Sequence, residues 1–140
     1  MRKLSLLLAG SIALAAAPVA FAQTDFLTVK KISCVPEKMT RCQSPGKDCE
    51  SREASASDKQ QPLIIDFEAK KVSMRRGGET REFGVVVEDK VEGDTRKVKL
   101  RQGTDPATKD TLDFTLGKDG KMLGTREEGK ITFEATCSAS

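Results

Sequence analysis

Apolar side chains recur at every second position in several separate stretches of the chain after residue 61. In the first stretch, Leu63, Ile65 and Phe67 alternate with residues that include Asp66 and Glu68. The later stretches would each place one apolar set on one face: Phe83, Val85 and Val87; Val98 and Leu100; Leu112, Phe114 and Leu116; Ile131, Phe133, Ala135 and Cys137. A period of two is typical of β-strands that bury one face, as in antiparallel sheets. The pattern therefore predicts an all-β chain of short strands.

Turn sequences separate these stretches and predict hairpins between them. Asp119-Gly120 is the strongest signal, because both central residues of a two-residue hairpin turn must tolerate positive φ. That turn would place Leu116 opposite Leu123. Further turns are expected at residues 77–78, 92–94 and 128–129, and a longer loop at 104–106. We therefore expect about eight strands in an antiparallel meander, folded as a small barrel or a sandwich.

The four cysteines favour two disulfides. They are Cys34, Cys42, Cys49 and Cys137, and their spacing forms no CxxC pair. Because the chain also has no histidine, a metal site is disfavoured. Cys34–Cys137 would join the first strand to the last, and Cys42–Cys49 would close the loop around Pro45. Other pairings, such as Cys34–Cys42 with Cys49–Cys137, stay open.

Residues 1–22 have the pattern of a cleaved secretory signal peptide. Arg2 and Lys3 precede an apolar run at residues 4–17, and the leader ends in Ala20-Phe21-Ala22. This run is shorter than the roughly 20 residues that span a bilayer, so we expect no membrane span after cleavage. Together with the cysteines, the leader predicts a periplasmic or secreted protein.

The remaining residues predict one domain. Residues 23–61 would hold the first strand and the Cys-containing loop region, with a loop or short helix in the polar residues 49–61. Residues 62–140 would hold the meander and complete the same domain. A chain of this length can bury a modest core. We expect it to be a monomer.

The charge balance disfavours a nucleic-acid partner. The leader holds two of the 24 basic residues and none of the 21 acidic ones, so removing it leaves a net charge of only +1. Such a surface lacks the basic excess that attracts a phosphate backbone. The chain also has no tryptophan or tyrosine on which bases could stack.

No set of residues predicts catalysis, so we expect neither enzymatic activity nor a cofactor. Ser44-Pro45-Gly46-Lys47 matches the S-x-x-K pattern of a Lys-activated serine, but Pro-Gly inside it indicates a turn. The adjacent acid pairs of the sequence stand at hairpin ends, where carboxylates are solvated. The only candidate contact is Arg75, Arg76 and Arg81 around Gly77-Gly78, which could bind an anion or a partner because arginine grips phosphate and carboxylate bidentately.

The chain resembles a group of short exported proteobacterial proteins that are rich in β structure. The features that carry the resemblance are the leader, the charged hairpin-rich middle, the early cluster of Cys34, Cys42 and Cys49, and Cys137 in the last strand. The resemblance covers most of the chain and implies a periplasmic β domain without an assigned activity. The outline of a small disulfide-linked barrel is also similar to that of the periplasmic lysozyme inhibitors.

Three functional hypotheses follow. The first is a non-enzymatic β module that binds a protein or an envelope component. The second is an inhibitor of a hydrolase that acts in the envelope, with the Cys42–Cys49 loop as the inserting segment. The third is a carrier of a small apolar ligand inside the barrel, since barrels of about eight strands are either filled by side chains or hold one small ligand.

Overall fold

The structure is a computed structural model that describes residues 24–103 and 105–140. The predicted signal peptide lies outside the described residues. The elements are β1 (Lys31–Ser44), β2 (Lys47–Glu53), α1 (Ala56–Lys59), β3 (Leu63–Asp66), β4 (Lys71–Arg76), β5 (Glu79–Glu92), β6 (Thr95–Gln102), β7 (Thr111–Gly117), β8 (Lys121–Arg126), η1 (Glu127–Gly129) and β9 (Ile131–Ala139). The predicted all-β antiparallel fold is confirmed.

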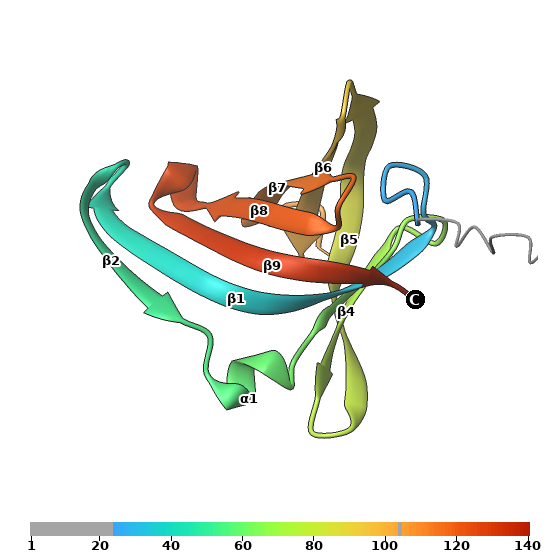
Figure 1. The fold of residues 1–140 in the computed structure, drawn as a ribbon, viewed down its shortest axis with the longest axis horizontal. Coiled ribbons are helices and arrows are strands. Elements are labelled where there is room, and N and C mark those ends of the chain that lie inside the picture. Colours follow the sequence, from blue (N-terminus) through green and yellow to red (C-terminus); the bar gives the residue numbers. More distant parts are fainter. Residues whose placement is uncertain (1–23, 104) are drawn as a thin grey trace, which may run out of the picture.

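The strands form one antiparallel sheet that returns to its first strand. From β3 to β9 each strand pairs with the next along the chain, and β9 pairs antiparallel with β1; the two strands run side by side in Figure 1. On its other side, β1 pairs first with β3 and then, farther along, with β2. The ladders therefore make a closed circuit of eight strands, and β2 adds a ninth at the edge.

Strand β2 is an addition to the predicted fold. The sequence pattern predicts only a loop between Cys42 and Cys49 and a loop or short helix beyond. In the structure, Pro45-Gly46 forms a two-residue turn and all of β2 is exposed. Because neither face of β2 packs on the core, its sequence carries no apolar alternation. The predicted short helix is present as the single turn of α1.

The core lies on the inner face of the closed circuit, and most of the predicted inward residues are there. Val98, Leu100, Leu112, Phe114, Leu116, Ile131, Ala135 and Cys137 are all buried. The prediction for β5 was wrong: Val86 is buried at 6% exposure, whereas Val87 is 41% exposed. Register shifts between Val72 and Ser73, and between Val86 and Glu88, cause the change, because a bulge reverses the side-chain alternation.

The predicted register of the β7–β8 hairpin is also corrected. Leu116 pairs with Met122, and Leu123 pairs with Thr115 and is 52% exposed. The loop holds three residues rather than two, with Gly120 at φ +83° at its end. A three-residue hairpin loop commonly ends in such a left-handed glycine. One extra loop residue shifts the register by one and turns Leu123 to the outer face.

The two disulfides are Cys34–Cys137 and Cys42–Cys49, the pairing that the sequence analysis put first. Both bridge residues that lie directly opposite each other in antiparallel ladders. Cys34–Cys137 is in the core and ties β1 to β9, whereas Cys42–Cys49 lies in the β1–β2 hairpin outside the closed circuit.

Candidate functional site

A cavity of about 240 Å³ opens on the inner face of the sheet. Its apolar lining comes from seven strands, β1, β3, β4, β5, β7, β8 and β9. The lining includes Met39, Leu63, Met74, Phe83, Met122 and Phe133. A second hollow of about 220 Å³ adjoins it beneath α1 and shares Met39, Met74 and Phe133 with it. We call the first hollow the apolar cavity.

Strand register explains how these side chains come together. Met39 on β1 lies opposite Phe133 on β9, which lies opposite Gly124 on β8. The next row on the same face is Pro36, Ala135 and Met122, two residues farther along β8 and β9 and three along β1, where a bulge lies between Pro36 and Lys38. Alternation along paired strands therefore stacks these residues as layers of one wall.

Gly124 makes room for Phe133 in this wall. A Cβ atom at Gly124 would lie 1.9 Å from Cζ of Phe133, so the aromatic ring covers the β8 backbone directly. Phe133 is only half-buried because its other side faces the apolar cavity. The glycine thus sets the depth of the cavity at this point.

The methionines of the domain gather around the apolar cavity. The sequence has four, and Met39, Met74 and Met122 all line it, while Met1 lies outside the described residues. Methionine is flexible and polarisable, and it is frequent on surfaces that adapt to varied apolar ligands. The lining can therefore adjust its shape to a guest.

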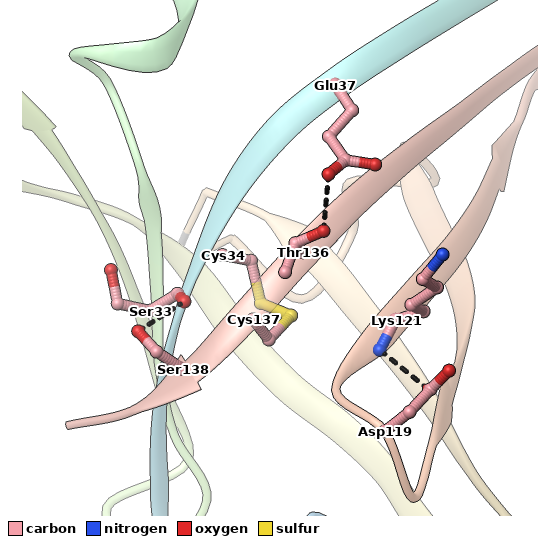
Figure 2. Close-up of a disulfide and its surroundings, with 8 residues drawn as sticks. All are labelled: Ser33, Cys34, Glu37, Asp119, Lys121, Thr136, Cys137 and Ser138. Carbon is pink, nitrogen blue, oxygen red and sulfur yellow. Dashed lines mark hydrogen bonds between the residues drawn. A yellow bond between two sulfur atoms is a disulfide. The ribbon is translucent and has the colours of Figure 1, made fainter.

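The core disulfide lies at the wall of the cavity. Cys34 lines it, and Figure 2 shows the Cys34–Cys137 bridge passing between β1 and β9. The outer side of the same strands is polar: the Ser138 hydroxyl donates to the Ser33 carbonyl at 3.5 Å, and the Thr136 hydroxyl donates to Glu37. The bridge therefore holds together the two strands whose pairing closes the sheet.

Two arginines supply the charge at one edge of the cavity. Arg41 on β1 and Arg126 on β8 both lie opposite Ile131 on β9, so the three residues form one row across three strands. We call this row the cationic row. Arg126 donates through Nη2 to Asp110 at 2.6 Å and to Gln102 at 3.3 Å. Its guanidinium is therefore held in place.

The guanidinium of Arg41 is less constrained than that of Arg126. Glu50 lies opposite it in the β1–β2 register, yet Arg41 takes part in no ion pair within the part of the chain that the structure describes. Arg41 and Arg126 are the charged residues that line the apolar cavity, and the carboxylate partner of Arg126, Asp110, lies outside that lining.

The far end of the inner face is closed by a different arginine. Arg96 is 6% exposed and makes a bidentate ion pair with Asp89, with both N–O distances 2.7 Å. Its Nη1 donates to the carbonyls of Val29 and Phe26, which belong to the segment before β1. That segment lies at the right of Figure 1, and the tip of the β1–β2 hairpin lies at the left. Arg96 thus binds the N-terminal segment over the end opposite the cationic row.

The short helix α1 borders the second hollow. Ser55 caps the helix, and the Asp58 carboxylate accepts from Arg52 at 2.8 Å and from the Ser55 backbone N–H at 2.9 Å. The pKa of Asp58 is lowered to about 2, mainly by the hydrogen bond from Arg52 and secondly by the hydrogen bond from the Ser55 N–H. The Asp58 carboxylate is therefore ionised at neutral pH and already hydrogen-bonded to Arg52 and Ser55.

The arginines singled out in the sequence lie on the β4–β5 hairpin. Arg75 and Arg76 are neighbours in β4, so their side chains leave opposite faces of the strand. Arg81 on β5 pairs with Glu79 at 3.3 Å. The hairpin turn of residues 77–78 lies between the two strands as expected. The three arginines are thus exposed near one tip, on both faces of the hairpin and with a carboxylate among them.

The residues around the apolar cavity escaped the sequence analysis. Met39, Met74 and Met122 follow no shared spacing, and the two arginines of the cationic row lie 85 positions apart, at 41 and 126. The Cys34–Cys137 pairing predicts that β1 lies beside β9, but the bulge between Pro36 and Lys38 shifts the register by one residue. The pairing alone would therefore have placed Thr40, not Arg41, opposite Ile131.

A larger groove of about 800 Å³ is lined by residues 109–111, 113 and 125–130 and shares Arg126 with the apolar cavity. Its lining is hydrophilic and mixes both charge signs, including the Arg126–Asp110 ion pair. Ligand sites are usually apolar with a few convergent polar groups, so the smaller apolar cavity is the better candidate.

No helix within residues 24–103 and 105–140 has the length and apolar composition needed to cross a membrane. The chain matches no protein-family model, no curated protein and no solved structure.

Proposed function

We propose that this protein is an exported, non-enzymatic binding protein whose closed circuit of strands acts as a small barrel for an apolar ligand. The observation that carries the proposal is the apolar cavity, with its lining of methionine, phenylalanine and leucine side chains. Small-molecule sites generally take this form, including the mouths of β-barrels. The two disulfides favour an oxidising compartment, so the ligand would be an envelope component or an extracellular molecule.

The cavity volume sets the size of the ligand. A water-sized group occupies roughly 30 Å³, so about 240 Å³ holds on the order of eight such groups. A short alkyl chain fits this space, whereas a bulky ring system does not. Linear alkanols are therefore suitable probes, because they carry a tail without a charge.

The test is methyl NMR of the oxidised protein labelled with 13C at the methionine methyl groups. Because Met39, Met74 and Met122 all line the cavity, each methyl group reports directly on occupancy. We expect 1-octanol to shift all three signals, and affinity to rise about fourfold for each methylene from hexanol to octanol, at about 0.8 kcal/mol per buried CH₂. Unshifted methionine signals at saturating octanol would reject the proposal.

A matched pair of variants locates the binding. Leu63→Trp fills the cavity, and Leu123→Trp places the same side chain on the outer face, where Leu123 is already exposed. We expect the first variant to lose octanol binding and the second to retain it. Thermal unfolding of both variants separates a filled cavity from a misfolded protein.

The β1–β2 hairpin supports a second candidate function, inhibition of an envelope hydrolase. The Cys42–Cys49 bridge holds an exposed hairpin whose tip is the Pro45-Gly46 turn. A pre-organised loop loses little conformational entropy when it enters an active site. The test is peptidoglycan hydrolysis by a lysozyme with the oxidised protein and with a Lys47→Glu variant at the tip. Undiminished hydrolysis at a tenfold excess of the oxidised protein would exclude this candidate for that enzyme.

A further inference from the structure

The inner wall of the sheet changes from charged to apolar along the strands. The cationic row holds Arg41 and Arg126 on either side of Ile131. The next inward row is Met39, Phe133 and Gly124. Below it lie Pro36, Ala135 and Met122, and then the Cys34–Cys137 bridge. A molecule in the cavity would thus have one end near the guanidinium groups of Arg41 and Arg126, and the rest of the molecule would lie against apolar side chains.

The spacing of the two arginines suits one small head group. Neighbouring strands lie about 4.8 Å apart, so residues on β1 and β8 that flank the same β9 residue stand roughly 10 Å apart at their backbones. Arginine side chains are long enough to converge on a group placed above Ile131. The row can therefore contact a single carboxylate or phosphate from both sides.

The donors of both arginines are available. Arg126 uses Nη2 for Asp110 and Gln102, which leaves Nε and Nη1 for another acceptor. Arg41 makes no ion pair within residues 24–103 and 105–140. The acid bordering the adjoining hollow, Asp58, is bound by Arg52. Arg126 is paired with Asp110, and Glu50 stands opposite Arg41 in the β1–β2 register without forming an ion pair with it, so among the described residues Arg41 supplies the unpaired positive charge beside the cavity.

We propose that the apolar cavity binds a single-chain amphiphile with an anionic head, the tail lying against Met39, Met74 and Phe133 and the head between Arg41 and Arg126. This inference rests on the proposed function, because it requires the cavity to accept a chain. It adds the chemistry of the head group: a carboxylate, as in a free fatty acid, or a phosphate, as in a lipid.

The test compares octyl probes that share one tail and differ in the head. Octanoate, octyl phosphate, 1-octanol and octyltrimethylammonium are titrated separately into the oxidised protein at pH 7.5, followed by the methionine methyl signals. A charge-assisted hydrogen bond strengthens binding by about tenfold or more, so we expect an anionic probe to bind at least tenfold tighter than octanol. The cationic probe should bind more weakly than octanol.

Variants assign the head group to the cationic row. Arg41→Gln should weaken binding of the anionic probe at least fivefold more than it weakens binding of octanol. Arg126→Gln should act in the same direction. Arg75→Gln serves as the matched control, since Arg75 is an exposed arginine that does not line the cavity, and it should change neither affinity. Raising NaCl from 50 to 500 mM should weaken the anionic probe alone.

The outcomes separate this inference from the proposed function. Equal binding of octanoate, octyl phosphate and octanol, unaltered in Arg41→Gln, would overturn the anionic-head inference and leave the apolar site standing. Failure of all four probes to shift the methionine signals would overturn both. Preference for octanoate would assign a free fatty acid as the ligand class, and preference for octyl phosphate a phosphate-headed lipid.

Discussion

Arg96 is the buried charged side chain of the described domain, and its guanidinium has hydrogen-bond acceptors around it. Arg96 donates two hydrogen bonds to the Asp89 carboxylate and one each to the carbonyls of Phe26 and Val29. The Cζ atom of Arg96 lies 3.5 Å from the centroid of the Phe67 ring. A buried charge requires such partners, because its removal from water is otherwise costly. The arginine therefore fastens the segment before β1 to strands β5 and β6.

Replacing Arg96 with alanine should destabilise the fold strongly. The change would leave the carbonyls of Val29 and Phe26 without their donor, whereas the Asp89 side chain is 29% exposed and its carboxylate would stay hydrated, so we expect a loss of about 1–3 kcal/mol. Urea unfolding followed by far-UV circular dichroism measures the loss. Lys97→Ala is the control, because Lys97 follows Arg96 directly and its ion pair with Glu92 is exposed. Equal stability of the two variants would refute a fastening role for Arg96.

Gly124 gives a second prediction for a single residue, in which a substitution changes both stability and ligand binding. An alanine Cβ would overlap the Phe133 ring, so the ring would have to move toward the apolar cavity. We expect Gly124→Ala to lose about 1–3 kcal/mol of stability, the usual cost of overpacking, and to weaken octanol binding. Urea unfolding and methionine methyl NMR measure the two effects. Octanol affinity equal to that of the parent chain would show that Phe133 does not bound the ligand.

At the scale of elements, the sequence pattern predicts strands well where one face is buried throughout. Strands β6, β7 and β9 keep the predicted inward residues because their alternation is uninterrupted. Prediction failed in β5, where two bulges change the inward set, and in β2, where no face is buried. A bulge depends on the partner strand, so the sequence of one strand alone does not reveal it.

The helix α1 carries an element-scale prediction about pH. The pKa of Asp58 is lowered to about 2, first by the Arg52 hydrogen bond and then by the Ser55 N–H. Its contribution to folding is therefore complete above the ordinary carboxyl pKa near 4 and is lost as the pH falls through about 2. In a pH titration by NMR, the Ser55 amide should shift with a midpoint near pH 2. A midpoint near 4 would show that Arg52 does not hold the carboxylate.

At the scale of the whole molecule, the candidate site depends on contacts that sequence patterns do not encode. The cavity needs Met39 beside Phe133 and Met74 beside Leu63, and these pairs come from the closing of the sheet and the order of its strands. The lining residues are spread over seven strands, with at most four on any one of them, so no local motif marks the site. The cysteine pairing is the exception, because a bridge between the first and last strands predicts their adjacency.

The two disulfides should therefore contribute unequally to stability. Cys34–Cys137 links residues 103 positions apart, whereas Cys42–Cys49 links residues 7 apart. In the chain-entropy estimate, loops of these lengths are worth about 4–5 and about 2 kcal/mol. We expect urea unfolding of the Cys34→Ala/Cys137→Ala variant to show the larger loss, together with weaker octanol binding, since Cys34 lines the cavity.

The Cys42→Ala/Cys49→Ala variant should lose less stability and keep octanol affinity, because its bridge lies in a hairpin outside the closed circuit. Equal losses in both variants would mean that hydrogen bonding between β1 and β9 closes the sheet without help from the core bridge.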